Sequence, residues 1–252
     1  MHNKIIYEIL ESRKGSRIKF IILFFLILIR QSCAETFFNE MQTPLTTSAQ
    51  NPFFVGAGLT LTAVILEDQL VDPLQEDTIE DKPLGSFSHL GDLMGQLVPN
   101  IAYYSAMKAH YFFAKNDESN LNAQIMLKAT FYSALATNIL KYTIREPRPN
   151  GSARNSFPSG HTTSAFAFAS VAGAIHGWKW GIPAYAIAVF AGFSRINDNA
   201  HYLHDVLGGA TIGLGYGLGI TYLLKKKILN TNLIVCPLLI KSFSGIRLVY
   251  NF

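Results

Sequence analysis

Charged residues are almost absent from six apolar stretches of this chain, and each stretch has the length of a helix. They lie near residues 52–66, 95–114, 122–141, 161–177, 180–194 and 206–224. The last one runs for 19 residues without a charge between Asp205 and Lys225. Uncharged stretches of this length are typical of membrane-spanning or fully buried helices. We therefore expect an all-α fold, a six-helix bundle. The bundle could be embedded in a membrane or soluble, and both alternatives stay open.

The composition points the same way. Only 15% of the residues are charged and 49% are apolar, whereas soluble domains usually carry about 25% charged residues. Such a composition also excludes a disordered chain. The whole net charge of +4 lies in residues 1–34, so the chain has no basic surface of the kind that binds nucleic acid. Two cysteines, Cys33 and Cys236, are too few for a disulfide scaffold.

The N-terminal region has the pattern of a targeting segment. Residues 20–29 are ten consecutive apolar residues that follow a basic stretch, and ten helical residues span about 15 Å, half of a bilayer core. This length fits the apolar region of a secretory signal, and Ser32-Cys33-Ala34 offers a cleavage site. An uncleaved anchor is the alternative.

Four regions follow from these patterns. We expect a signal peptide or N-terminal anchor at 1–34, a polar lead-in at 35–51, a helical core at 52–224 and a tail at 225–252. The tail alternates weakly between apolar and polar residues, which predicts a short β-hairpin. Within the core, residues 67–82 carry seven acids and one lysine, and we interpret them as a solvated loop.

Polar residues gather at the junctions between the predicted helices. The segment 141–161 has four cations and a histidine between the third and fourth helices, and the segment 194–205 lies between the fifth and sixth. Helices that run alternately up and down bring both junctions to the same end of the bundle. The sequence thus predicts one polar site at one end of the core.

The residue types at this end suit a phosphate-like dianion. Lys141, Arg148 and Arg195 supply donors without a matching set of acids. Ser159 and Gly160 open the fourth helix, where free N–H groups and the helix dipole favour an anion. We therefore expect an anion-binding pocket made by these residues.

Two histidines could supply the chemistry of this pocket. His201 and Asp205 are four residues apart, so at a helix start they share a face. A carboxylate that holds one ring nitrogen leaves the other as a nucleophile. His161, from a different helix, could protonate the leaving oxygen.

Three motifs together resemble the signature of the type 2 phosphatidic acid phosphatase superfamily. They are Lys141-x6-Arg148-Pro149, Pro158-Ser159-Gly160-His161 and Ser194-Arg195-x5-His201-x3-Asp205. The superfamily also contains class A acid phosphatases and vanadium haloperoxidases. The motifs span residues 141–205, and the order of the six helices extends the resemblance to about 52–224.

The resemblance implies a role for each residue of the signature. His201 would attack phosphorus to form a phosphohistidine, Asp205 would orient it, and His161 would be the general acid. The phosphoryl oxygens would be held by Lys141, Arg148, Ser159, Gly160 and Arg195. No metal and no cofactor is implied, and zinc held by His201 would be repelled by the neighbouring cations. Arg145, Arg154 and His204 lie outside the signature. We interpret His204 as structural, and Arg145 and Arg154 as structural or solvent-facing, with a contact to the substrate as the alternative.

The substrate we expect is the phosphate monoester or pyrophosphate of an envelope lipid, such as phosphatidic acid, lipid A or a prenyl pyrophosphate. Only eight residues separate Pro149 from Pro158, so no cap domain fits there. The alternative is a soluble periplasmic acid phosphatase. A non-catalytic lipid-phosphate-binding protein and a vanadate haloperoxidase are further alternatives, and no obligatory protein partner is evident.

The location we expect is a bacterial-type envelope, with the site outside the cytoplasmic membrane. Lys115, Lys179 and the lysines at 225–227 lie in the loops opposite the site, where the positive-inside tendency places the cytoplasm. A cleaved leader followed by six spans would give the opposite orientation. An uncleaved leader, a first segment that does not span, or a periplasmic bundle would each resolve this conflict.

Overall fold

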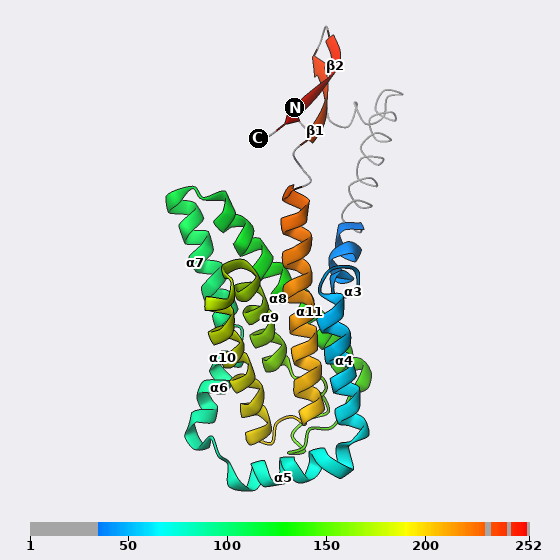
Figure 1. Cartoon of the computed structure of the whole chain (residues 1–252), viewed down its shortest axis with the longest axis vertical. Helices are drawn as coiled ribbons and strands as arrows, with labels where there is room; N and C mark the ends of the chain where they lie inside the picture. The colour runs from blue at the N-terminus through cyan, green and yellow to red at the C-terminus, as the bar shows by residue number, and fades with distance from the viewer. Residues whose placement is uncertain (1–34, 230–232, 241–242, 251–252) are drawn as a thin grey trace, which may run out of the picture. The chain divides into compact units, whose positions relative to one another are not determined.

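The structure, a computed structural model, describes residues 35–229, 233–240 and 243–250 (Figure 1). The chain divides into two compact units, Met1–Gln42 and Thr43–Phe252. Of the first unit the structure describes residues 35–42, and 35–41 of these are helical. The predicted signal peptide or anchor at 1–34 lies outside the described residues. All the contacts below belong to the second unit.

The second unit has a helical core over residues 43–229. Its elements are α3 (Thr43–Thr46), α4 (Gln50–Ile65), the π-helical turn η1 (Glu67–Val71), α5 (Asp72–Asp81), the 3-10 turn η2 (Gly85–Phe87), α6 (Ser88–Gly95), α7 (Val98–Ala114), α8 (Asp117–Ile144), α9 (Gly160–His176), α10 (Trp178–Asn197) and α11 (Leu203–Leu229). Two strands follow, β1 (Leu233–Ile240) and β2 (Phe243–Tyr250), which pair antiparallel. The all-α core that the sequence predicts is therefore present.

Each predicted apolar stretch corresponds to one long helix, but the structure adds shorter ones. The six stretches correspond to α4, α7, α8, α9, α10 and α11, while α3, α5 and α6 were not expected. Helix α8 begins five residues before the predicted stretch because Asn116 caps it: its side chain accepts a hydrogen bond from the N–H of Ser119 at 2.9 Å. The predicted loop at 67–82 is wrong, since η1 and α5 occupy it.

Helix α11 is the central element and packs against α4, α8 and α9. Two of its glycines let α9 approach closely. A Cβ added at Gly209 would lie 2.5 Å from the carbonyl oxygen of Ser159, and one at Gly213 would lie 2.5 Å from that of Thr163. The spacing of these glycines therefore serves helix packing.

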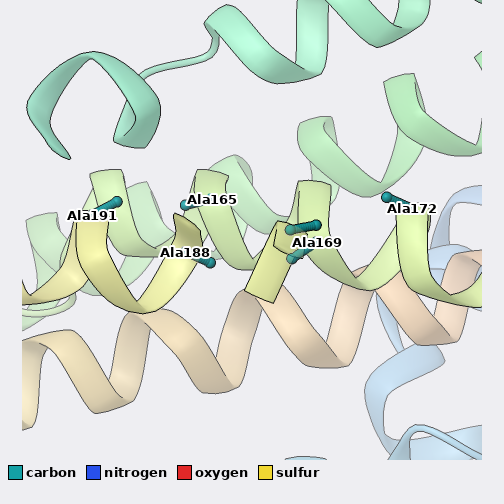
Figure 2. Packing of buried hydrophobic residues seen from close by; sticks show 6 residues of the cluster. Ala165, Ala169, Ala172, Ala188 and Ala191 are labelled. Atoms are coloured by element: carbon teal, nitrogen blue, oxygen red, sulfur yellow. The ribbon is translucent and has the colours of Figure 1, made fainter. Parts of the chain in front are cut away.

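Alanines form the contact between α9 and α10 (Figure 2). Figure 2 shows Ala165, Ala169 and Ala172 of α9 beside Ala188 and Ala191 of α10, and all five are buried. Short side chains allow the two helices to lie close together along their length. This contact fixes the start of α9 relative to the end of α10, and both of these ends carry residues of the predicted site.

Helix α5 lies across the end of the bundle where α10 and α11 meet (Figure 1). Gln75 of α5 is buried, and its side-chain amide donates to the carbonyl oxygen of His201 at 3.5 Å. The N–H of Leu84 donates to the side chain of Asn197 at 3.1 Å. The acidic segment therefore supports the loop between α10 and α11 instead of extending into solvent.

One helical stretch of the described residues, Leu203–Lys226, is long and apolar enough to cross a membrane. Most of this stretch is buried inside the core. The outer helices carry large apolar side chains that are exposed, such as Phe54 and Leu59 on α4 and Trp180 and Val189 on α10. The buried and the exposed apolar surfaces are thus both extensive.

Candidate active site

The central feature of the site is a buried histidine–carboxylate pair. His201 is 2% exposed and Asp205 is fully buried. Nδ1 of His201 lies 3.3 Å from Oδ2 of Asp205, and the N–H of Tyr202 donates to the same oxygen at 2.9 Å. With Nδ1 held by the carboxylate, Nε2 is the nitrogen that can attack an electrophile.

Ser156 completes the surroundings of this pair, and the sequence analysis missed it. Its hydroxyl donates to Oδ2 of Asp205, and its Oγ lies 3.3 Å from Nδ1 of His201. The residue is fully buried. Its position in an irregular loop, outside every helical pattern, gave no signal in the sequence.

Two of the predicted cations meet over the same loop. Nζ of Lys141, in the last turn of α8, donates to the carbonyl oxygens of Asn155 and Ser156. Nε of Arg148 donates to the side-chain oxygen of Asn155 at 3.0 Å. Asn155 therefore places both cations beside His201, and it too was missed.

The start of α9 is held by Ser159 in a way that the sequence did not predict. The hydroxyl of Ser159 accepts from the N–H and the hydroxyl of Thr162, at 3.5 and 3.0 Å, and its own N–H donates to the carbonyl oxygen of Asp205 at 3.0 Å. Ser159 is thus the fully buried N-cap of α9. The N–H groups of Gly160 and His161 are left free in the first turn of α9. The carbonyl oxygens to which they would donate, four residues earlier, lie before the start of the helix.

Arg195 was predicted to have no acidic partner, but the structure gives it two. Its guanidinium pairs with Asp92 of α6 at 2.5 Å and with Asp198 at 2.8 Å. The same oxygen of Asp92 lies 3.1 Å from Nε2 of His161. Arg195 and His161 are therefore adjacent, but the expectation that the cations lack matching acids is wrong. Asp92 lies upstream of the three motifs, where nothing marked it.

A comparison with protein-family models matches residues 123–229 to the PAP2 superfamily. These residues include all three motifs and, apart from Asp92, the residues around His201 and His161 just described, which we call the PAP2 pocket. Over this range the chain is similar to the PAP2 superfamily. The match confirms the resemblance drawn from the motifs.

Several proteins are similar to parts of this chain. A lipid A 1-phosphatase of Porphyromonas gingivalis is 35% identical over 136 residues, which is 53% of this chain but only 30% of that protein. A lipid A 1-phosphatase of Rhizobium johnstonii is 27% identical over 64% of this chain and 76% of that protein. The crystal structure of Aquifex aeolicus LpxE has a TM-score of 0.51 at 21% identity and covers 60% of this chain and 94% of that one. This last likeness shows a shared fold.

The electrostatics of the PAP2 pocket favour a neutral His201. Burial lowers the pKa of His201, Asp205 opposes this shift, and Lys141 and Arg148 lower the pKa further. Burial and the neighbouring Arg148 also lower the pKa of Lys141 to about 8, against the opposite effect of Asp205. A bound dianion would favour the charged form of Lys141.

A second polar cluster lies behind the PAP2 pocket. His204 is 2% exposed, and its Nε2 lies 2.9 Å from Oε1 of Glu146. Arg145 and Arg154 line a cavity of about 420 Å³ together with Glu67, Glu146 and His204. These two arginines therefore do not line the second cavity, the apolar cleft beside His161 that is described below.

Among the described residues, one group has the composition of a metal site. Glu146, His204 and Asp205 offer ligand atoms that lie within 4.8 Å of one another. Nε2 of His204 already pairs with Glu146, and Asp205 holds His201. Nδ1 of His204 and Oδ1 of Asp205 are buried and have no hydrogen-bond partner among the described residues.

An apolar cleft of about 560 Å³ adjoins the PAP2 pocket. Lys141, Gly160 and His161 form its polar end, and apolar residues of α7 and α8 form its sides. Val98, Ile101 and Ala134 are among these apolar residues. The cleft therefore has a polar end with the cation Lys141 and apolar sides.

Proposed function

We propose that this chain is a metal-independent phosphatase that hydrolyses a phosphate monoester or pyrophosphate of an envelope lipid through a phosphohistidine intermediate. The observation that carries the proposal is that Lys141 and His161, whose charges act on His201, also form the polar end of the apolar cleft. A pocket for a phosphate at the end of an apolar cleft fits an amphipathic substrate.

The first half of the reaction forms a bond from Nε2 of His201 to phosphorus and breaks the bond from phosphorus to the lipid oxygen. Asp205 holds Nδ1 and balances the positive charge that develops on the ring. His161 donates its proton to the leaving oxygen. The lipid alcohol departs and the phosphoryl group stays on His201.

The second half releases inorganic phosphate. Neutral His161 takes a proton from a water molecule, whose oxygen bonds to phosphorus as the bond to Nε2 of His201 breaks. Lys141, Arg148, Arg195 and the N–H groups of Gly160 and His161 stabilise the charge of the equatorial oxygens in both steps. For Ser159 we propose an indirect part, through the capping that orients these N–H groups.

Lipid A or a lipid phosphate of similar shape is the substrate class we propose. The names of the relatives from Porphyromonas gingivalis and Rhizobium johnstonii support it, and so does the apolar cleft. The loop between Pro149 and Pro158 is too short to fold as a cap domain over the pocket. A large substrate can therefore approach the site from one side.

We further propose that the six long helices α4 and α7 to α11 are the catalytic core, that the strands β1 and β2 are an appendage, and that the core is anchored in the inner membrane. The exposed apolar side chains of α4 and α10 and the apolar length of α11 support membrane association. Lys115 and Lys179 lie at the helix ends opposite the site, which favours a periplasmic site above the apolar layer.

The test of the activity is phosphate release from a panel of lipid phosphates by purified full-length protein. The panel holds lipid A, phosphatidic acid and a prenyl pyrophosphate in micelles, with p-nitrophenyl phosphate as the water-soluble comparison. We expect release from a lipid that is insensitive to chelator, and a loss of at least about a thousandfold in His201→Ala. Release from p-nitrophenyl phosphate alone would contradict the lipid substrate, and chelator-sensitive release would contradict the mechanism.

The test of the orientation is a single cysteine at Ser152, in a chain whose Cys33 and Cys236 are replaced by serine. Ser152 is exposed in the loop at the site end. We expect a membrane-impermeant thiol reagent to label Ser152→Cys in cells with an opened outer membrane. Labelling only after lysis of the inner membrane would contradict the periplasmic site.

A further inference from the structure

One carboxylate oxygen joins two residues of the pocket that come from different helices. Oδ1 of Asp92 lies 3.1 Å from Nε2 of His161 and 2.5 Å from a guanidinium nitrogen of Arg195. Oδ2 of the same side chain accepts from the amide of Gln96 at 3.0 Å. Both oxygens of Asp92 are therefore held, and one of them contacts the general acid of the proposed reaction.

The position of Asp92 follows from two close contacts of its helix. A Cβ added at Gly95 would lie 2.7 Å from Cβ of His161, and one at Gly91 would lie 2.4 Å from Cβ of Ser194. Helix α6 thus packs directly on the start of α9 and on the end of α10. A larger residue at either glycine would move Asp92 away from His161.

The other charged or titratable groups around His161 disfavour its protonated form. They are Arg195 of α10, Arg148 and His201 of the two loops, and Lys141 of α8, which lines the same cleft. Burial lowers the pKa of His161, and Arg195 lowers it further, while Asp92 raises it. Among these neighbours, Asp92 is the one that favours the proton.

We propose that Asp92 is a positioning residue of this phosphatase: it keeps a proton on Nε2 of His161 and fixes His161 beside Arg195 until the leaving oxygen arrives. The inference rests on the proposed function. The leaving oxygen takes the proton from Nε2 as the phosphorus–oxygen bond breaks, and neutral His161 later accepts a proton from water. Asp92 itself neither gains nor loses a proton.

A different role for Asp92 would be competition with the substrate. A carboxylate on Arg195 occupies donors that a phosphoryl group could use. In that case its neutralisation would lower KM and leave kcat unchanged or higher. The two roles therefore make opposite predictions.

The experiment compares Asp92→Asn with the wild type in the full-length protein, with kcat and KM measured against pH on a lipid phosphate. An asparagine can keep the oxygen that faces His161 and Arg195 but loses the negative charge. We expect kcat to fall about 10- to 100-fold at alkaline pH and the alkaline limb of kcat to move down by about one pH unit. KM should change little.

A second substrate separates an effect on the proton from a general loss of structure. The leaving group of p-nitrophenyl phosphate is a stable anion that needs no proton. Asp92→Asn should therefore lose much less activity on p-nitrophenyl phosphate than on the lipid. An equal loss on both substrates would overturn the proposal.

A matched carboxylate serves as the control. Asp198 also pairs with Arg195, at 2.8 Å, but the structure places its contact on the other guanidinium nitrogen. Asp198→Asn should leave the alkaline limb in place. A shift of the limb in Asp198→Asn equal to that in Asp92→Asn would assign the effect to Arg195 and overturn the role at His161.

A conservative variant covers the case in which Asp92→Asn does not fold. Asp92→Glu keeps the charge, so it should keep the alkaline limb of the wild type even if its rate is lower. An unchanged pH profile in Asp92→Asn, or a lowered KM with undiminished kcat, would overturn the inference alone. A wild type without phosphatase activity would overturn the proposed function, and the inference with it.

Discussion

The hydroxyl of Ser156 donates to the carboxylate oxygen of Asp205 that also faces Nδ1 of His201. One oxygen thus serves the ring, a hydroxyl and the N–H of Tyr202. Asp205 is fully buried, and a buried charge is stable only when hydrogen bonds and opposite charges compensate it. Ser156 is therefore part of what keeps Asp205 ionised and aligned.

Replacement of this serine should slow the reaction without weakening substrate binding. In Ser156→Ala we expect kcat to fall about tenfold or more, since a hydrogen bond to a charged group contributes about 1.5–3 kcal/mol. KM should stay within about threefold of the wild type, since Ser156 is buried behind His201. Steady-state kinetics on the lipid substrate measures both. The control is Ser152→Ala in the exposed part of the same loop, and a loss as large in this control would refute the role of Ser156.

The pH dependence should show a nucleophile that stays neutral in mild acid. Burial lowers the pKa of His201, and attack needs the unprotonated ring. As the pH falls, activity is therefore retained below the ordinary histidine value of about 6.5 and is lost only at the lowered pKa. The acidic limb of kcat/KM, measured between about pH 4 and 8, reports this value. An acidic limb above about 6.5 would contradict the shift.

Lys141 should act through its charge and through its hydrogen bonds to the loop at Asn155 and Ser156. In Lys141→Met we expect kcat/KM to fall at least about a hundredfold, as for the loss of a donor to a developing oxyanion. Lys141→Gln keeps hydrogen bonding to the carbonyl oxygens of Asn155 and Ser156 but has no charge. If this glutamine variant had wild-type activity, the charge of Lys141 would have no part in the reaction. Kinetics of both variants on one substrate decides the question.

Filling the apolar cleft should affect lipid substrates alone. Ala134 lines the cleft, so a larger ring in Ala134→Phe would occupy the space for the apolar part of the substrate. We expect KM for the lipid to rise at least about tenfold, with p-nitrophenyl phosphate hydrolysed as before. Leu127→Phe, at an exposed position of the same helix, is the control. Equal effects of Ala134→Phe on both substrates would show that the cleft does not hold the lipid.

The contact between α11 and α9 should govern stability. A Cβ at Gly213 would lie 2.5 Å from backbone oxygen, where nothing can yield. We expect Gly213→Ala to cost about 1–3 kcal/mol and to lower the melting temperature by about 4–10 °C. At Gly58, an added Cβ meets nothing within 4 Å, so Gly58→Ala should stabilise helix α4 slightly. Thermal unfolding of the two variants in one detergent tests the contrast, and equal melting temperatures would contradict it.

The sequence predicts the parts of this site that depend on helix periodicity. Alternating helices place Lys141, His161 and His201 at one end, and the structure has them there. Helix α5 (Asp72–Asp81) was missed because the segment 67–82, with its seven acidic residues, has no apolar stripe of helical period. Pro73 in its first turn is a helix-start signal that could have indicated it.

Residues that reach the site through tertiary contacts could not be predicted in the same way. Asp92 reaches His161 only because α6 packs on α9 through Gly95, and no local pattern encodes that contact. Ser156 and Asn155 belong to an irregular loop whose path depends on the groups that it contacts. The carboxylate partners of Arg195 were missed for the same reason.

The hydrogen bond from the N–H of Ser159 to the carbonyl oxygen of Asp205 ties the helix that carries the anion donors to the helix that follows the nucleophile. The apolar walls of the cleft, by contrast, come in part from α7, which has no residue in the three motifs. If the proposed function holds, we expect catalysis and lipid selection to depend on separate surfaces of one fold. In related enzymes we therefore expect substitutions in α7 to change lipid selectivity. The distance from Nε2 of His201 to the groups proposed to bind the phosphoryl oxygens would stay the same.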